Sequence, residues 1–275
     1  AFALQVARWL VETGARHLGL AGRSGPSEQA KTKIAEMAES GVEISESRVD
    51  MASGEQVTAL VDSINREMSP LRGVVHAAGV LDDGMLVNLS RESVARVMRP
   101  KVTGAWHLHR STSGTGLDFF VMFSSAAAVL GSPGQGNYAA ANAFMDALAH
   151  WRKMQGEAAL SINWGPWADS GMAADLGRQN GSGAIFAGME MISSEKAMEI
   201  LDRLVGEDTA QAGVMPIDWP DFLQRFPANG IPPVLTHFAD KRRAGETGTS
   251  SVLDKLGKAP FATRQDLLAG HLQDR

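Results

Sequence analysis

The chain has 275 residues, of which 44% are hydrophobic, so it is long enough for one α/β domain with an appendage, or for about one and a half domains. Its formal net charge of −5 and the lack of a basic stripe argue against a nucleic-acid partner. It contains no Cys, which excludes a disulfide framework, and no apolar run approaches the ~20 residues of a membrane span. We therefore expect a cytoplasmic protein with neither a membrane nor a nucleic acid as partner.

The first 50 residues predict a helix, a strand, a second helix and a second strand. Residues 1–14 show helical apolar spacing with Gly14 as C-terminal cap, and residues 17–21 predict a short strand. A helix over residues 27–40 and a strand over residues 42–49 follow. An α/β nucleotide-binding domain should open with a strand and a Gly-rich turn, and neither precedes the first helix. We expect the chain to begin inside such a domain, with its first strand and Gly-rich loop absent.

The same alternation of helix and strand continues beyond residue 50. We predict a helix over residues 55–68, a strand over residues 73–77 and a long helix over residues 90–109. Pro100 lies inside the long helix, where the missing N–H of proline should kink it near Lys101. Taken alone, a Lys on a helix is usually a solvated surface charge.

The central stretch, residues 119–148, carries polar groups that suit carbonyl chemistry. Five apolar residues from Phe119 predict a strand buried on both faces of a parallel sheet, and two serines ending at Ser125 follow it. Ligands bind at that end of the strands in such sheets. After a Gly-rich loop comes Tyr138, the one Tyr of the chain, with Asn142 one helical turn further on. A Ser and a Tyr so placed could polarise and protonate a carbonyl, although each alone is more often structural.

The last third of the chain predicts a strand, a helix and another strand, over residues 158–162, 194–204 and 213–217. Five aromatic residues in this region are expected to pack in the core, namely Trp164, Trp167, Trp219, Phe222 and Phe226. From residue 227 the composition changes, and the polar run over residues 241–251 has the make-up of a flexible linker.

Three motifs together resemble a known family. They are HAAGVLDDGML at residues 76–86, FSSAAAVLGSPGQGNYAAANAF at residues 123–144 and NWGPW at residues 163–167. They resemble the ketoreductase domain of a modular polyketide synthase, which belongs to the short-chain dehydrogenase/reductase superfamily. The resemblance implies a Rossmann-like doubly wound parallel sheet. We divide the chain into a catalytic domain (1–225), a linker (226–251) and a C-terminal segment (252–275), either the start of a carrier-protein region or a post-reductase helix.

The resemblance assigns catalytic roles to four residues. Tyr138 would donate a proton to the substrate oxygen, and Ser125 would donate a hydrogen bond to it. Lys101 would favour the phenolate and hold the nicotinamide ribose, and Asn142 would orient a relay water or the Lys. Most of the superfamily carries Lys four residues after the Tyr, where Asn142 stands here. The family compensates by placing Lys and Asn at exchanged positions, which Lys101 and Asn142 match.

The resemblance also implies NADPH as the cofactor. Arg23 follows the second strand of the fold, where an Arg accommodates the 2′-phosphate. The positions that match cofactor-binding residues of the family are Arg23, Ser24, Asp50, Met51, Ala77, Ala78, Gly79, Lys101, Tyr138, Pro166, Trp167 and Met172. Met172 would start a mobile lid that runs into the Gly-rich segment 177–188. No metal is expected.

Two positions carry an expectation about stereochemistry. Leu81-Asp82-Asp83 matches the LDD motif of B-type enzymes, which give a D-configured hydroxyl. A-type enzymes instead carry a Trp in the loop before the Tyr, where Leu130 stands here. Asp83 and Leu130 are therefore the expected substrate and stereocontrol residues. An acidic turn capping the next helix would explain the two aspartates equally well.

The implied reaction is the NADPH-dependent reduction of a β-ketoacyl thioester on an acyl carrier protein to the D-β-hydroxyacyl thioester. The expected partners are that carrier protein and the other domains of the same synthase. Two alternatives remain open. A stand-alone dehydrogenase of a small carbonyl compound is disfavoured by the Lys–Asn exchange and the linker. A non-reducing domain kept for structure or epimerisation is disfavoured by the presence of all four catalytic-type residues.

Overall fold

The computed structural model describes residues 2–168, 188–226 and 230–238. The chain divides into two compact units, the first formed by residues 1–182 and 191–216 and the second by residues 183–190 and 217–275. The six strands of the described residues all lie in the first unit. The second unit contains helix α10 (Trp219–Leu223) and the 3-10 turn η3 (Pro233–Leu235).

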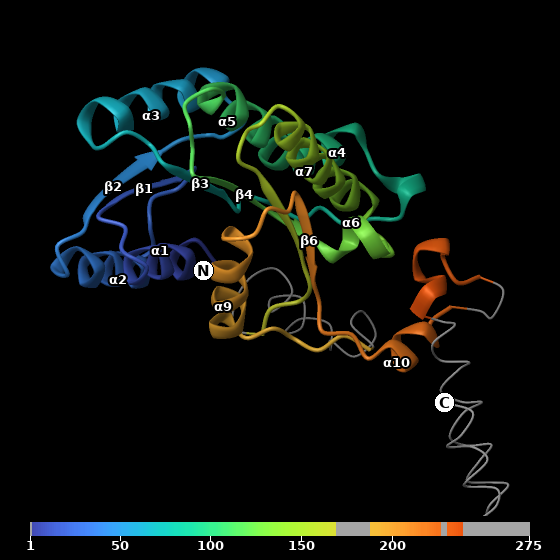
Figure 1. Cartoon of the computed structure of the whole chain (residues 1–275). Helices are drawn as coiled ribbons and strands as arrows, with labels where there is room; N and C mark the ends of the chain where they lie inside the picture. The colour runs from blue at the N-terminus through green and yellow to red at the C-terminus, as the bar shows by residue number, and fades with distance from the viewer. Residues whose placement is uncertain (1, 169–187, 227–229, 239–275) are drawn as a thin grey trace, which may run out of the picture. The chain divides into compact units, whose positions relative to one another are not determined.

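Helices and strands alternate along the first unit (Figure 1). The strands are β1 (His17–Gly22), β2 (Glu43–Arg48), β3 (Gly73–His76), β4 (Phe119–Ser125), β5 (Leu160–Trp164) and β6 (Gln211–Val214). The α-helices are α1 (Phe2–Glu12), α2 (Glu28–Glu39), α3 (Gly54–Glu67), α4 (Arg91–Met98), α5 (Gly104–Thr112), α6 (Ala126–Leu130), α7 (Gly136–Met154) and α9 (Ser194–Val205). A 3-10 turn, η1 (Leu86–Asn88), and a π-helical segment, η2 (Arg99–Thr103), complete the unit.

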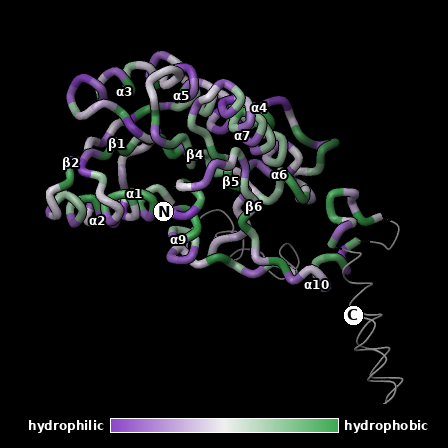
Figure 2. Tube along the Cα trace, in the orientation of Figure 1, coloured by the Kyte–Doolittle hydropathy of each residue, from purple (hydrophilic) through white to green (hydrophobic). Residues whose placement is uncertain are grey.

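All strand pairs are parallel, which confirms the expected α/β fold. The strands form two ladders rather than one continuous sheet: β1 pairs with β2, and β3, β4, β5 and β6 pair in that order. Figure 1 shows α1, α2 and α9 on one side of the strands and α3, α5 and α7 on the other. In Figure 2 these helices carry both hydrophobic and hydrophilic residues, as expected for helices that pack one face on a sheet.

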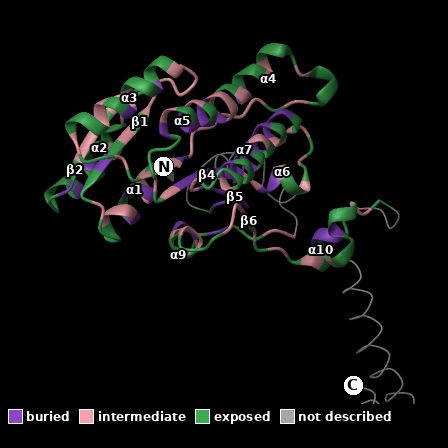
Figure 3. Ribbon diagram, turned by 45° about the horizontal axis from the view of Figure 1, so that its top comes forward, coloured by how far each residue is buried: buried purple, intermediate pink, exposed green. Residues whose placement is uncertain are grey.

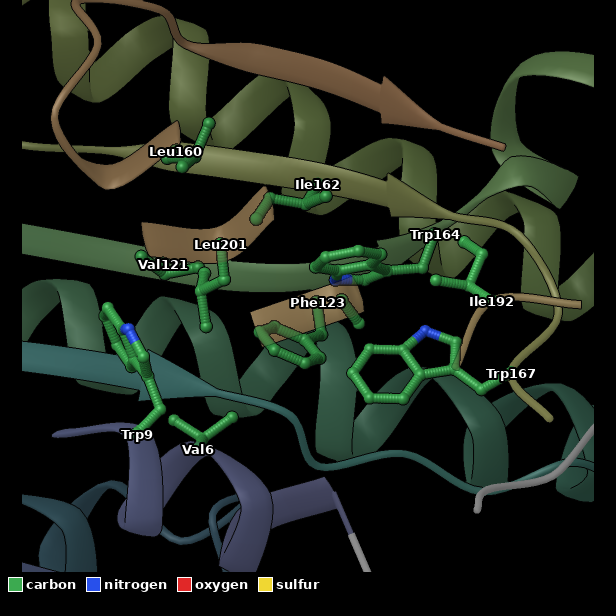
Figure 4. Close-up of a cluster of buried hydrophobic side chains, with 11 residues drawn as sticks. Val6, Trp9, Val121, Phe123, Leu160, Ile162, Trp164, Trp167, Ile192 and Leu201 are labelled. Carbon is green, nitrogen blue, oxygen red and sulfur yellow. The ribbon is translucent and has the colours of Figure 1, made fainter. Parts of the chain in front are cut away.

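Strand β4 is buried on both faces, as predicted from its unbroken apolar run. Val121 and Phe123 pack with residues of α1, β5 and α9 (Figure 4). Phe120 and Met122 point to the opposite face and pack with residues of α5 and α7. Figure 3 shows the buried residues concentrated in β4, β5, α5 and α7. The end of β4 is therefore held rigidly from both sides.

Two elements differ from the prediction in ways that matter for the site. The long helix predicted over residues 90–109 is interrupted by η2, which contains Pro100. The N–H of Gly104 reaches back to the carbonyl of Arg99, so the chain widens into a π turn where proline would clash in a regular helix. Helix α6 was not predicted, because it is a single short turn between β4 and the Gly-rich loop.

The five aromatic residues expected in the core are divided between the two units. Trp164 and Trp167 lie in the core of the first unit, at 5% and 3% exposure. In the second unit Trp219 stacks on Phe238, with ring centroids 3.8 Å apart. The other two aromatic residues, Phe222 and Phe226, also pack in the second unit.

Within the described ranges, no helix is long and apolar enough to cross a membrane. The described residues also contain no group of three or more His, Cys, Asp or Glu side chains that could hold a metal ion. The linker and C-terminal segment assigned from the sequence lie mostly outside the described residues, so that division stays a prediction.

Candidate active site

Tyr138 lies in the first turn of α7 and is 9% exposed. Burial raises the pKa of its phenol above 10, and the nearby charge of Asp83 adds to the rise. The polar side chains of Ser125 and Asn142 act in the opposite direction and lower this pKa. Tyr138 is therefore a neutral phenol near pH 7, which is the form that can donate a proton.

Lys101 is buried at 3% exposure because the π segment η2 turns it toward the sheet. Its Nζ donates a hydrogen bond to the carbonyl of Phe123 at 2.9 Å and lies 5.4 Å from the centroid of the Tyr138 ring. Burial lowers the pKa of Lys101 to about 7, while the charge of Asp146 partly opposes that fall. The structure thus brings Lys101 and Tyr138 together from different helical segments, the arrangement that the family resemblance implied.

Ser125 ends strand β4 and begins α6. Its Oγ accepts a hydrogen bond from the N–H of Ala127 at 3.2 Å, so Ser125 caps the short helix that sequence analysis missed. A hydroxyl has one hydrogen to donate and two lone pairs, so this cap leaves its O–H free for Tyr138 or for a bound oxygen. Ser125 and Tyr138 are close enough for their side chains to hydrogen-bond.

Asn142 is completely buried one turn beyond Tyr138. Its Nδ2 donates to the backbone carbonyl of Tyr138 at 2.8 Å. Its Oδ1 is also buried and has no hydrogen-bond partner among the residues that the structure describes. A buried amide oxygen without a partner is costly, so this acceptor marks a place where a hydroxyl or a water would be stabilised.

The LDD turn is tied to the loop that precedes Tyr138. Gln135 Nε2 donates to Asp83 Oδ2 at 2.9 Å, and Asn137 Nδ2 donates to the carbonyl of Asp82 at 2.8 Å. Asp82 also faces Arg96 on α4 at 3.3 Å. Leu130 is half-buried at the end of α6. Asp83 and Leu130 therefore lie in the two segments that flank the N-terminal turn of α7.

The small residues after β3 leave room for Lys101. A Cβ at Gly79 would lie 2.9 Å from Cε of Lys101, so the lysine side chain would have to shift to make room for any larger residue. Ala77 and Ala78 are half-buried. The resemblance assigned these three residues to cofactor binding, and the structure adds that Gly79 also accommodates the catalytic-type lysine.

Arg23 and Ser24 are exposed just beyond β1. The structure places a second cation, Arg48, close to this turn, and the sequence did not predict it. Arg48 ends β2 in register with Gly22 of β1. Its Nη2 lies 3.1 Å from the position a Cβ of Gly25 would take, so the guanidinium rests on the Gly25 turn. The sequence could have indicated Arg48, because parallel neighbouring strands place their carboxyl ends at the same edge of the sheet, and Arg48 stands at the end of β2.

The remaining predicted cofactor residues are placed as follows. Asp50 Oδ1 accepts from the N–H of Ala52 at 3.0 Å, and Met51 is half-buried against the α3–α5 side of the core. The carbonyl of Pro166 accepts from the N–H of Ile192 at 2.8 Å. The Trp167 indole packs on Trp164 in the core, so it faces away from solvent. Met172 lies outside the described residues, as does most of the segment 177–188.

Comparison with known proteins gives a family match over much of the chain. Residues 1–169 match the family model described as KR domain. A phenolphthiocerol/phthiocerol polyketide synthase of Mycobacterium tuberculosis is 37% identical over 275 residues, covering 98% of this chain and 12% of that relative. Polyketide synthase GfsB of Streptomyces halstedii is 39% identical over 274 residues, covering 98% of this chain and 5% of that relative. The chain therefore spans a small part of each relative.

A solved structure described as A-type ketoreductases from a modular polyketide synthase is similar in both sequence and fold. It superposes with a TM-score of 0.80 at 38% identity, covering 86% of this chain and 49% of that chain.

Proposed function

The chain belongs to the KR domain family, the ketoreductase domains of modular polyketide synthases within the short-chain dehydrogenase/reductase superfamily. We propose that it reduces the keto group of a β-ketoacyl thioester with NADPH. We take the thioester to be carried on an acyl carrier protein and the product to be the D-β-hydroxyacyl thioester. The observation that supports the proposal most is the convergence of Tyr138, Ser125 and Lys101 at the end of β4.

The described residues fit a nicotinamide cofactor. The unpartnered Oδ1 of Asn142 and the buried Nζ of Lys101 offer an acceptor and a donor for ribose hydroxyls. Arg23 and Arg48 offer two cations at the far end of the site, where a 2′-phosphate would be held. When bound, the cofactor supplies a hydride to the keto carbon.

The chain's own groups act on the keto oxygen. Ser125 donates a hydrogen bond that strengthens as negative charge develops there. Tyr138 then gives its proton to the forming alkoxide, which is far more basic than a phenolate even with the pKa of Tyr138 raised. The Lys101 ammonium stabilises the phenolate left behind, since it lies over the same ring.

The direct test is the oxidation of NADPH by the full chain in the presence of a β-ketoacyl N-acetylcysteamine thioester. Loss of NADPH fluorescence together with formation of the β-hydroxyacyl thioester is the expected result. NADPH binding without reduction of any β-keto thioester would contradict the proposal and favour a non-reducing domain.

We expect Arg23→Ala to weaken NADPH binding while NADH binding changes little. The variant removes a cation that pairs with the 2′-phosphate, a charge-assisted contact worth roughly 1.5–3 kcal/mol, which is about a tenfold to hundredfold change in Kd. Arg48→Ala should act in the same direction, since its guanidinium rests on the adjacent Gly25 turn. Fluorescence titration with both cofactors measures the effect, and equal losses for NADPH and NADH would place Arg23 away from the phosphate.

We expect the unmutated chain to give predominantly the D-β-hydroxyacyl thioester. The expectation rests on the LDD motif and on Leu130, although the similar solved structure is described as A-type. Asp83 is joined to Gln135 beside the Tyr138 turn, so Asp83→Ala should loosen that flank and erode selectivity without abolishing reduction. Selectivity needs little energy, since about 1.4 kcal/mol is tenfold in rate. Chiral chromatography measures the configuration of the product. A predominantly L-configured hydroxyl would overturn the B-type proposal and leave the proposed ketone reduction standing.

A further inference from the structure

Asp146 is a buried carboxylate on the same face of α7 as Tyr138 and Asn142. The three residues are spaced by four, so they follow one line along the helix. Asp146 is 7% exposed. A carboxylate is expensive to bury unless donors or an opposite charge compensate it. Such a residue in line with the tyrosine calls for an explanation beyond packing.

Two side chains of β5 donate hydrogen bonds to Asp146. Ser161 Oγ donates to Oδ1 at 2.6 Å, and Asn163 Nδ2 donates to Oδ2 at 2.8 Å. The same Asn163 amide also lies 3.2 Å from the carbonyl of Ser125. Gln211 Nε2 donates to Asn163 Oδ1 at 2.8 Å, which fixes the direction in which the amide points. Asp146 thereby connects α7 to the end of β4 that carries Ser125.

The charge of Asp146 also acts on Lys101. The Lys101 ammonium is buried, and the acceptor of its hydrogen bond is the neutral carbonyl of Phe123. Burial lowers the pKa of Lys101 to about 7, and the Asp146 carboxylate acts against that fall. A buried cation needs an anion in its surroundings more than an exposed one does, because water screens it less.

Two other titratable groups in the described part of the chain, His76 and Tyr138, interact with Lys101, and neither carries a charge near pH 7. His76 on β3 is buried, and burial followed by the charge of Lys101 lowers its pKa to about 4. Its Nε2 is engaged with the carbonyl of Pro100 at 2.9 Å. Tyr138 on α7 has a raised pKa and stays protonated. Asp146 therefore supplies the negative charge that favours the ammonium form.

We propose that Asp146 is a positioning residue of this site: its carboxylate, bonded to Asn163, holds the strand end that carries Ser125 and favours the ammonium form of Lys101, whose acceptor Phe123 lies on the same strand. The effect on turnover rests on the proposed ketoreductase function. The effect on the protonation of Lys101 does not, so the two can be tested separately.

The first test is an NMR titration of the full chain with lysine labelled at Cε, in which Lys101→Met assigns the Lys101 signal. Asp146→Asn removes the charge but keeps the size, so the proton affinity of Lys101 should fall about tenfold. Ser161→Ala is the matched control, since it removes a hydrogen bond to Asp146 and leaves the charge. An unchanged Lys101 midpoint in Asp146→Asn, or an equal fall in Ser161→Ala, would overturn the proposal.

The second test measures kcat against pH with NADPH and a β-ketoacyl N-acetylcysteamine thioester. Asp146→Asn should move the alkaline limb to lower pH, so that the ratio of kcat at about pH 8 to kcat at about pH 6 falls about fivefold. An unmoved limb in a folded, active variant would overturn the positioning role. If the unmutated chain reduced no β-keto thioester while the Lys101 midpoint still responded, only the proposed reaction would fail. Asp146→Ser, which leaves room for a water, replaces Asp146→Asn if that variant does not fold.

Discussion

Tyr138→Phe should lower the turnover of a β-ketoacyl thioester by about 10²–10⁴-fold while NADPH binding survives. The change removes the phenolic proton and leaves the ring, which is 9% exposed and packs with Val97 and Ala141. General acid catalysis by one positioned side chain contributes a factor of that size. Stopped-flow or steady-state NADPH fluorescence measures turnover, and an equilibrium titration measures binding.

The same substitution should cost only about 1 kcal/mol of stability, because it removes a single buried hydroxyl and leaves the packed ring in place. Thr112→Val is the matched control, since it also removes a buried hydroxyl, one that donates to the carbonyl of Leu108 at 2.7 Å, away from the site. Turnover should be unchanged in that control. Near-normal reduction by Tyr138→Phe would remove Tyr138 from the chemistry.

The parts of the site that sequence reasoning found are those fixed by local pattern. The five apolar residues from Phe119 are a strand because both faces are buried, and Ser125 follows at its end. Tyr138 and Asn142 share a helix face because of their spacing alone. The role of Lys101 was assigned from the family resemblance. The π segment that contains Lys101 turns its side chain inward, which explains how it reaches the site.

The parts that sequence reasoning missed depend on contacts between distant residues. Arg48 meets the Gly25 turn because β1 and β2 pair in a particular register. Asp146 gains its importance from donors on β5, which no helical spacing can reveal. Helix α6 is too short to show a period, and its start depends on the side chain of Ser125 as a cap. In each case a tertiary contact or a local cap decides the role.

Lys101→Met should abolish most turnover and weaken NADPH binding by about tenfold or more. One ammonium is proposed both to stabilise the Tyr138 phenolate and to bind the ribose, and a lost charge-assisted hydrogen bond costs roughly 1.5–3 kcal/mol. The proposed role needs Lys101 in its ammonium form. In the unmutated chain activity should therefore fall as the pH rises through the Lys101 pKa of about 7, because the side chain then loses its proton. Turnover and cofactor titrations across about pH 6 to 9 measure both effects.

Lys101→Met should also raise the free energy of unfolding near neutral pH. The pKa of Lys101 falls from 10.5 to about 7 on burial, so the folded state binds its proton more weakly than the unfolded state does. Each tenfold difference in proton affinity between the folded and unfolded states is worth about 1.4 kcal/mol. The buried Lys101 therefore destabilises the native chain by a few kcal/mol below about pH 7. That penalty declines between about pH 7 and 10.5 and is absent above it, and the lost bond to Phe123 offsets part of the gain.

Chemical denaturation of Lys101→Met at about pH 6.5 and about pH 9.5 tests this, with the larger stabilisation expected at the lower pH. Lys153→Met on the outer side of α7 is the control, because its ion pair with Asp208 is at the surface and worth little. A stabilised but inactive Lys101→Met would mean that the site keeps a buried cation for chemistry at a cost in stability. A variant with normal turnover and altered stability alone would make Lys101 a structural residue.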